Sequence, residues 1–294
     1  MSDARVVAVT GANGYVGSIV AKAAKSRGTV VALVRTPQRS DDVAWSFADD
    51  PQALTAALRS RAVTDLVHAA WHMKAGSMSE MKRTCVAGSA RLFDAARAAG
   101  VRRLIFISTI SAFDEARSAY GRSKVLTEKT ALRCGAVVIR LGLVYGHGVG
   151  GVFGSLQGIV RHSILVPLVG FGMAPQYLLH ENTLAQVIKR ALNGDFDGET
   201  RPITLAHPQP LPFREVVARI AAAENRRVIL VPVPWRLLYF GVSMLERLGL
   251  DLSIRSDSLL SLIYQNREPD FSALANYRIE PAAFSDWQRP GGQA

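Results

Sequence analysis

Residues 6–17, VVAVTGANGYVG, join a short Val-rich run to three glycines placed three residues apart. The run has the composition of a buried strand, and the glycine segment leads directly into a helical stretch that begins near Tyr15. Gly11, Gly14 and Gly17 permit a tight turn, a close approach of the backbone to a phosphate, and close packing of the helix on the strand. In this strand–turn–helix context the pattern predicts that a dinucleotide binds here, with its pyrophosphate at the helix N-terminus.

Strand and helix patterns alternate through the first 140 residues. Ala-rich helical stretches separate the apolar runs, and Gly28 and Gly100 stand where two of these helices would end. Continuous apolar strands that alternate with helices indicate a parallel sheet covered on both faces. The sequence therefore predicts a doubly wound α/β fold of the Rossmann type. The runs that predict strands are RVVAVT (5–10), TVVALV (29–34), TDLVHAA (64–70), RRLIFIS (102–108) and AVVIRL (136–141).

The pattern changes after Tyr145. A glycine-rich loop, GHGVGGVFG (146–154), comes first, and proline then becomes frequent, as in HPQPLP (207–212) and VPVPW (231–235). These features indicate a smaller C-terminal α/β region that binds substrate. The predicted division is a nucleotide-binding domain at 1–150, to which 176–200 return, and a substrate-binding region made of 151–175 and 201–294.

The charge is concentrated in the first half of the chain. Residues 1–150 hold 21 Lys and Arg against 11 Asp and Glu, which is nearly all of the net charge of +11. This balance fits either a basic solvated surface or a field that attracts an anionic cofactor or substrate. The basic residues are scattered and form no aromatic-interleaved motif, so we expect no nucleic-acid binding.

Cysteine and histidine are sparse and form no metal-binding pattern. Cys85 and Cys134 are far apart, which suggests a reducing compartment. His68 and His72 are four residues apart but follow a strand pattern, and no third ligand is evident, so we expect no metal site. The first residues contain an acid, Asp3, and run into a strand, unlike a signal peptide; we expect a cytoplasmic protein.

Residues 237–250, LLYFGVSMLERLGL, are apolar nearly all round. The longest uncharged run in this stretch is too short to span a bilayer, so we expect no transmembrane segment. A buried or partly capping helix is one interpretation. A peripheral contact with a membrane interface, or an apolar surface for a partner, is the other.

The end of the second predicted strand bears on the choice of cofactor. Arg35 stands where a protein that prefers NAD often has an acid for the ribose 2′-hydroxyl, and Asp41 and Asp42 come late. Arg35, helped by Arg39, suits the 2′-phosphate of NADP. We therefore expect NADP, with NAD as the alternative in which Arg35 stacks on adenine or faces solvent. Asp49 is a weaker candidate for the adenine amino group.

A tyrosine and a lysine lie four residues apart in SAYGRSK (118–124). On a helix, Tyr120 and Lys124 share one face. A phenol with an ordinary pKa of about 10 is a poor base at neutral pH, but the Lys124 cation together with the positive charge of oxidised nicotinamide favours the phenolate and lowers that pKa. Thr109, at the end of the strand before this helix, faces the edge of the sheet where ligands bind. The three residues indicate proton exchange with a substrate hydroxyl or carbonyl.

The motifs together resemble the NAD(P)-dependent epimerase/dehydratase group of the extended short-chain dehydrogenase/reductase superfamily. The resemblance covers nearly the whole chain. Its motifs are TGANGYVG (10–17), DLVHAA (65–70), LIFISTISAF (104–113), YGRSK (120–124), VIRLGLVYGHG (138–148), YLLHENTLAQVI (177–188) and PDFSALANYRIEP (269–281).

The resemblance also implies roles for individual residues. Thr109 would hydrogen-bond the substrate oxygen, Tyr120 would be the acid/base, and Lys124 would be its partner and would hold the nicotinamide ribose. The weakest assignments are Ser111, His147 and His180 near the substrate. The cofactor would contact Gly11, Asn13, Gly14, Tyr15, Val16, Gly17, Ala69, Ala70, Tyr120, Lys124 and the backbone near Leu143.

Some positions depart from the family pattern. Ile110 and Ser111 follow Thr109 where the dehydratases have an acidic pair, which argues against a 4,6-dehydratase. Cys85 stands where Asn is common, and the loop before Tyr120 is shorter than in sugar-nucleotide enzymes. Two more changes are Leu141 for a usual Pro and Asn182 for an Asp.

We therefore expect an NADP-dependent oxidoreductase or epimerase that acts on a hydroxyl or carbonyl carbon of a nucleotide-linked sugar. One alternative is a reductase of an apolar alcohol or ketone, steroid- or flavonoid-like; the other is a cofactor-binding regulatory or assembly protein without turnover. The resemblance also implies a homodimer formed through helices that flank the sheet.

Overall fold

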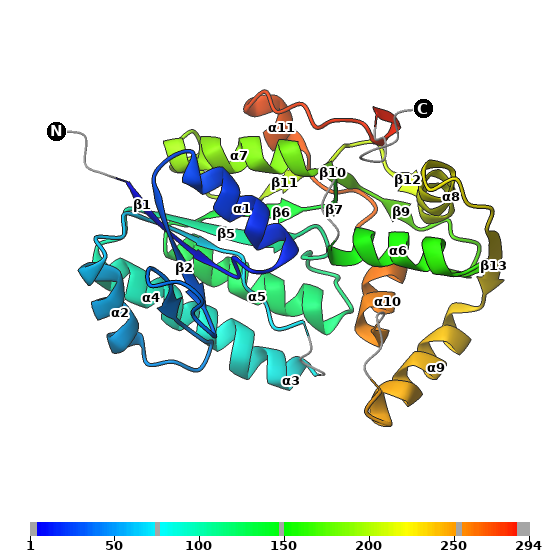
Figure 1. The fold of residues 1–294 in the computed structure, drawn as a ribbon, viewed down its shortest axis with the longest axis horizontal. Coiled ribbons are helices and arrows are strands. Elements are labelled where there is room, and N and C mark those ends of the chain that lie inside the picture. The colour runs from blue at the N-terminus through cyan, green and yellow to red at the C-terminus, as the bar shows by residue number, and fades with distance from the viewer. Residues whose placement is uncertain (1–4, 74–76, 147–149, 251–254, 287–294) are drawn as a thin grey trace.

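A parallel sheet of seven strands forms the centre of the molecule, in the order β11-β6-β5-β4-β1-β2-β3 (Figure 1). The computed structural model describes residues 5–73, 77–146, 150–250 and 255–286. The order confirms the doubly wound Rossmann-type fold, because the chain moves outward from β1 to β3 and then crosses to β4 on the other side. The strands are β1 Val6–Thr10, β2 Thr29–Val34, β3 Val43–Ala44, β4 Asp65–His68, β5 Arg103–Thr109, β6 Val137–Leu141 and β11 Ile203–Leu205.

Helices cover both faces of this sheet (Figure 1). Successive residues of β1 alternate between the two cores: Val7 and Val9 pack under α1, α7 and α11, whereas Ala8 packs under α2, α4 and α5. Double coverage explains why the strands are continuously apolar. The helices are α1 Tyr15–Lys25, α2 Pro51–Ser60, α3 Met78–Met81, α4 Ala87–Ala99, α5 Ala119–Arg133, α7 Glu181–Asn193 and α11 Ser272–Asn276, with a π-helical turn at Lys82–Val86 between α3 and α4.

A smaller region has its own core around Tyr145, Phe153 and Phe213. Its sheets have two strands each: β7 with β10, β9 with β12, and β8 with β13. The elements are β7 Leu143–Tyr145, α6 Gly151–His162, β8 Leu165–Val169, β9 Pro175–Gln176, β10 Leu178–His180, β12 Leu211–Pro212, α8 Phe213–Ala223, β13 Ile229–Val233, α9 Trp235–Arg247, α10 Ser256–Ile263 and a 3₁₀ turn at Phe284–Asp286.

The structure differs from the sequence-based expectations in three places. β11 extends the main sheet beside β6, although 201–294 was expected in the smaller region; three residues are too few to reveal their sheet from the sequence. Gly100 ends α4 with φ of +85°, but Gly28 is not left-handed and instead leaves no room for a Cβ beside the Arg5 carbonyl. No residue of α9 is buried, so this helix is not a buried one; several of its side chains are half-buried, which fits the other half of that interpretation, a partly capping helix.

Within the described ranges, no helix has both the length and the apolar character needed to cross a bilayer.

Candidate active site

The candidate site is built where β1 and β4 meet, at the point where the strand order reverses. In sheets of this topology the crevice at the carboxyl ends of these two strands is where ligands bind. Thr10 ends β1, and its hydroxyl accepts hydrogen bonds from the N–H groups of Ala69 and Ala70, both at 3.0 Å. The same hydroxyl lies 2.7 Å from His68 Nδ1. Thr10 therefore fixes the end of β4 beside the glycine turn.

The glycine turn is packed too closely against neighbouring backbone to accept side chains at Gly11 and Gly17. Gly11 has φ of +70°, and a Cβ there would lie 2.8 Å from the Ala70 Cα. A Cβ on Gly17 would overlap the Gly11 carbonyl oxygen, so the first turn of α1 packs directly on the loop. Gly14 is the N-cap of α1 and has an extended backbone. The open helix N-terminus and the bare backbone fit a pyrophosphate, as the sequence predicts.

The Tyr15 side chain turns away from the glycine turn toward the smaller region. Its ring fills the space against Gly150 and Gly151, and its hydroxyl lies 3.4 Å from Glu181 Oε2. Burial and the negative charge of Glu181 raise the pKa of Tyr15. The start of α1 is thereby connected to α6 and α7, and the candidate cofactor loop contacts both regions of the chain.

Arg35 follows the last residue of β2 and is exposed. The acids that come after it are used locally: Asp42 Oδ2 accepts the N–H groups of Gln38 and Arg39, at 2.9 and 3.0 Å. Asp41 lies 3.9 Å from Arg39. Arg35, and not an acid, is thus the charged residue immediately after β2, where the adenine ribose of a dinucleotide would lie.

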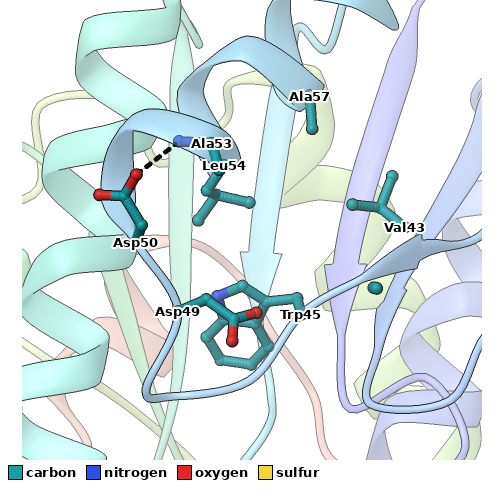
Figure 2. Close-up of a pocket in the computed structure, with 8 residues that line it drawn as sticks. Val43, Trp45, Asp49, Asp50, Ala53, Leu54 and Ala57 are labelled. Carbon is teal, nitrogen blue, oxygen red and sulfur yellow. Dashed lines mark hydrogen bonds between the residues drawn. The ribbon is translucent and has the colours of Figure 1, made fainter.

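Asp49 and Asp50 lie in a turn beside a pocket of about 270 Å³ between β3 and α2 (Figure 2). Asp50 caps α2 and accepts the N–H groups of Gln52 and Ala53. Asp49 accepts the N–H and the hydroxyl of Ser46, at 2.7 and 2.6 Å. This pocket lies at the edge strand, four strand spacings or about 19 Å from β5, so it is separate from the Tyr120 site.

The catalytic candidates come together at the ends of β5 and α5. Thr109 is the last residue of β5, and its side chain lies close enough to that of Tyr120, in the first turn of α5, to influence the pKa of the phenol. Ser118 caps α5 and accepts the Gly121 N–H at 3.0 Å. A Cβ on Gly121 would overlap the Ser111 carbonyl oxygen, so the short loop before Tyr120 packs tightly on this helix.

Lys124 lies beneath Tyr120 and is buried. Its Nζ donates to the Ile107 carbonyl oxygen at 2.8 Å and lies 4.0 Å from the centre of the Trp71 ring. Burial lowers the pKa of Lys124 to about 7, although the charge of Glu128 acts in the opposite direction. The lysine therefore titrates near neutral pH rather than remaining a fixed cation.

The pKa of Tyr120 differs from the sequence-based expectation. Burial raises the pKa of Tyr120 to about 12, and this effect exceeds the lowering by the hydrogen bond with Thr109. The lowering expected from Lys124 together with the charge of oxidised nicotinamide is not present in the protein by itself, because desolvation dominates the pKa of Tyr120. At neutral pH Tyr120 is a proton donor, and a base role requires a further positive charge beside it.

Two neighbours of the catalytic pair were missed by sequence reasoning. Trp71 packs edge-on to Tyr120, with ring centroids 6.3 Å apart. It directly follows Ala69 and Ala70, so its place after a strand end was a usable signal. Asp257 accepts the N–H groups of Ala119 and Tyr120, at 2.7 and 3.0 Å. It lies 137 positions after Tyr120, and no local pattern marks it.

The remaining predicted residues have structural contacts. Leu143 donates its N–H to the Tyr177 carbonyl oxygen at 2.8 Å, and Ser111 donates its N–H to Thr109 Oγ1 at 3.2 Å. His180 caps α7 and borders a second pocket, of about 350 Å³. His147 lies outside the described residues.

The residues weighed as metal ligands or redox groups are buried among protein partners. His68 Nε2 lies 2.8 Å from Ser89 Oγ, and burial with Lys124 nearby holds the pKa of His68 well below its ordinary value. Cys85 accepts the His72 N–H in the π-helical turn. Among the residues that the structure describes, no group of three His, Cys, Asp or Glu side chains could hold a metal.

The arrangement combines a glycine turn at the N-terminus of α1 with the neighbouring side chains of Thr109 and Tyr120 and a buried lysine. Tyr120 can give a proton to an oxygen that approaches Thr109, and Lys124 can change its charge in response to a bound ligand. The glycine turn follows β1 and Thr109 ends β5, with β4 between these two strands of the sheet.

The chain is similar to known enzymes. The sequence pattern of the NAD dependent epimerase/dehydratase family matches residues 7–193. The UDP-glucose 4-epimerase of Vibrio cholerae is 25% identical over 266 residues, which are 80% of this chain and 81% of that protein.

Two solved structures share the fold. The UDP-N-acetylglucosamine 4-epimerase of Bacillus cereus has a TM-score of 0.65 and 17% identity, over 90% of this chain and 99% of its own. The dTDP-glucose 4,6-dehydratase DesIV of Streptomyces venezuelae, solved with NAD bound, has a TM-score of 0.69 and 18% identity, over 96% of this chain and 94% of its own.

The family match spans more than half of this chain and includes both the glycine turn and the Tyr-x-x-x-Lys segment. The chain therefore belongs to the NAD dependent epimerase/dehydratase family of the extended short-chain dehydrogenase/reductase superfamily, and it is an NAD(P)-dependent enzyme.

Proposed function

We propose that the protein exchanges hydride with a nucleotide-linked sugar at a hydroxyl or carbonyl carbon, as an epimerase or an oxidoreductase. The observation that carries this proposal is that Thr109 at the end of β5 and Tyr120 in the first turn of α5 lie together above the buried Lys124. The three similar enzymes named above act on UDP- or dTDP-sugars, and the basic first half of the chain suits a diphosphate.

In this proposal Thr109 hydrogen-bonds the substrate oxygen and Tyr120 moves the proton. Gly11, Gly14 and Gly17 would hold the pyrophosphate of the cofactor at the N-terminus of α1. A bound nicotinamide supplies the hydride acceptor or donor. Its oxidised form also carries a positive charge, and such a charge beside Tyr120 would bring the high pKa of the phenol toward neutral pH.

The adenine end supports NADP as the preferred cofactor. Arg35 is an exposed cation at the end of β2, and Asp42 is occupied by two backbone N–H groups instead of being available to a ribose hydroxyl. Asp49 keeps acceptor capacity beyond its bonds to Ser46 and is assigned to the adenine amino group.

The proposal also includes a cellular location and an oligomeric state for the protein. Both Cys85 and Cys134 are free thiols, which supports a reducing, cytoplasmic location. Dimerisation through the helices that flank the sheet stays a prediction.

A second candidate function is reduction of an apolar alcohol or ketone. The Trp71 ring beside Tyr120 favours it, because an aromatic wall suits an apolar substrate better than a hydrated sugar.

The test is turnover by Tyr120→Phe. We expect the variant to bind NADPH as tightly as the unaltered protein and to lose at least about 10²-fold in turnover, the scale of general acid–base catalysis. Tyr277→Phe is the matched control, since the Tyr277 hydroxyl bonds Glu199 and takes no part in the site. Equal turnover by Tyr120→Phe would contradict the catalytic assignment.

Substrates are distinguished by a panel of UDP- and dTDP-sugars and apolar ketones. Net oxidation or reduction is followed by cofactor absorbance at 340 nm, and epimerisation by chromatography of the sugars. Turnover of nucleotide sugars supports the first candidate; turnover restricted to apolar ketones replaces it with the second.

A further inference from the structure

Helix α9, Trp235–Arg247, presents an apolar face that no described residue covers. Figure 1 shows the helix projecting from the body of the molecule at the lower right. The apolar residues of this face fall within about 80° of the helix circumference, so they form one continuous stripe. They are Leu237, Phe240, Met244 and the following Leu248, which are 66, 64, 49 and 71% exposed.

The opposite side of α9 is fixed to the protein. Glu246 accepts the N–H and the hydroxyl of Ser256, at 3.2 and 2.6 Å, and pairs with Arg255 at 3.2 Å. Trp235 packs edge-on to Tyr264 at the end of α10. These contacts define which side of α9 faces outward, so the apolar stripe is a stable feature of the fold.

Arginines border the stripe. By helical spacing, Arg236 and Arg247 lie next to Phe240 on its edge, and both are exposed; the Arg236 guanidinium also lies 5.6 Å from the centre of the Trp235 ring. The only acid within α9 is Glu246, which is paired with Arg255 on the side toward α10. We name the stripe and its two arginines the α9 surface; it is apolar in the middle and positive along one border.

We propose that the α9 surface docks on a bilayer surface that contains anionic phospholipids, with the helix lying in the plane of the interface. Leu237, Phe240, Met244 and Leu248 would enter the boundary between headgroups and acyl chains. Arg236 and Arg247 would extend to the phosphates while their methylene stems cover apolar surface.

The positive charge of the α9 surface favours an anionic bilayer over a second copy of the chain. A symmetric dimer would join the α9 surface to itself and bring the arginines of both helices into one interface. The surface offers no unpaired acid, among the described residues, to neutralise them. An anionic lipid surface supplies the missing negative charge together with an apolar layer.

A further exposed aromatic lies near the start of α9. The Gly170 N–H donates to the Val233 carbonyl oxygen at 2.8 Å, two residues before Trp235. Phe171, in the same turn, is 75% exposed. Phe171 therefore adds an exposed aromatic side chain in a turn that is hydrogen-bonded to the segment just before α9.

The test is sedimentation of the full chain with vesicles, which needs no knowledge of substrate. We expect binding to vesicles of phosphatidylcholine with 30 mol% phosphatidylglycerol, and little binding to phosphatidylcholine alone. Because each arginine near an anionic surface contributes about 1 kcal/mol, Arg236→Gln with Arg247→Gln should weaken binding about 30-fold.

The apolar part is tested by Leu237→Gln with Phe240→Gln. These side chains are exposed, so the variant should keep its unfolding temperature while losing at least about tenfold in vesicle binding. Ile164→Gln with Val152→Gln is the matched control, since both residues are similarly exposed elsewhere and should leave binding unchanged.

Two results would overturn the proposal. One is an absence of binding to the anionic vesicles, or equal binding by the α9 and control variants. The other is a dimer in analytical ultracentrifugation that Leu237→Gln with Phe240→Gln converts to a monomer, which would assign the surface to a second copy. Neither measurement depends on turnover, so loss of the proposed enzymatic function would leave this test intact.

Discussion

Burial of Lys124 opposes folding, because the ammonium group loses its hydration beneath Trp71 and Phe106. One carbonyl hydrogen bond and two ring faces replace water only in part, and the pKa falls to about 7. A residue that destabilises the fold and yet lies beside Tyr120 is typical of a group kept for function.

Lys124→Met should therefore stabilise the protein in the absence of cofactor, and the gain should depend on pH. The folded pKa is about 7 and the unfolded pKa is 10.5, so between these values the unfolded chain holds more protons and the unaltered protein gains stability as pH rises. Below pH 7 Lys124 is protonated in both the folded and the unfolded protein, so burial of its charge lowers the free energy of unfolding by the full amount. The gain in free energy of unfolding from Lys124→Met should be largest below pH 7. Above pH 7 this gain should fall by about 1.4 kcal/mol per pH unit.

Denaturant unfolding at pH 6, 7.5 and 9 measures this difference. Lys129→Met is the matched control, because Lys129 lies on the same helix but is exposed, and its effect should not vary with pH. A constant difference for Lys124→Met across the three pH values would contradict the lowered pKa.

Arg35 should decide cofactor preference at the adenine end. In Arg35→Asp the lost charge-assisted hydrogen bond to a 2′-phosphate, worth about 1.5–3 kcal/mol, should weaken NADP relative to NAD by roughly ten- to a hundredfold. Dissociation constants of both cofactors, measured by fluorescence, check this. Arg27→Asp makes the same charge change before β2 and should leave the ratio unaltered. Tighter NADP binding by Arg35→Asp would refute the assignment.

At the scale of elements, the start of α5 is held from outside its own region. The Asp257 carboxylate of α10 accepts two N–H groups of the first turn of α5, and a negative charge there also interacts favourably with the helix dipole. Arg117, just before α5, lies over the Tyr264 ring at the end of α10. The catalytic tyrosine candidate is thus oriented by the smaller region that is proposed to receive substrate.

Asp257→Ala should lower turnover more than it lowers stability. Loss of a capping carboxylate costs about 1 kcal/mol, whereas misplacement of Tyr120 should reduce kcat by about tenfold or more with little change in KM. Asp270→Ala is the control: Asp270 accepts the Ser272 N–H at the start of α11, so it should lose similar stability and keep kcat. If both variants keep kcat, Asp257 has only a structural role.

At the scale of the whole molecule, the candidate cofactor site joins loops from distant parts of the chain. The glycine turn follows β1, Ala69 and Ala70 follow β4, and Tyr15 contacts Glu181 and the start of α6. A ligand bound at this junction should stabilise the fold as one unit, because its affinity exists only in the folded state.

NADP at 100 times its Kd should raise the free energy of unfolding by about 2.7 kcal/mol, or the Tm by roughly 5–10 °C. Gly17→Ala should abolish this shift, since its Cβ would overlap the Gly11 carbonyl oxygen. Gly158→Ala is the control, because a Cβ there meets nothing within 4 Å. A normal shift in Gly17→Ala would place the cofactor elsewhere.

The sequence alone determined the doubly wound sheet, because buried parallel strands and their helices leave local patterns that need no knowledge of distant residues. It also predicted that Thr109, Tyr120 and Lys124 lie together, since a strand end and one helical turn fix their relation. Strand β11 is too short for its sequence to show which sheet it joins. The sequence of α9 also does not show which of its faces is exposed. A helix that is apolar nearly all round gives no sign of which side is covered.

The tertiary structure decided the chemistry of the site. The pKa values of Tyr120 and Lys124 depend on desolvation by Trp71 and Phe106, and desolvation is a property of packing that no spacing encodes. The contact from Asp257 joins residues 137 positions apart. Local patterns therefore placed the reacting groups, and long-range packing set their protonation and orientation.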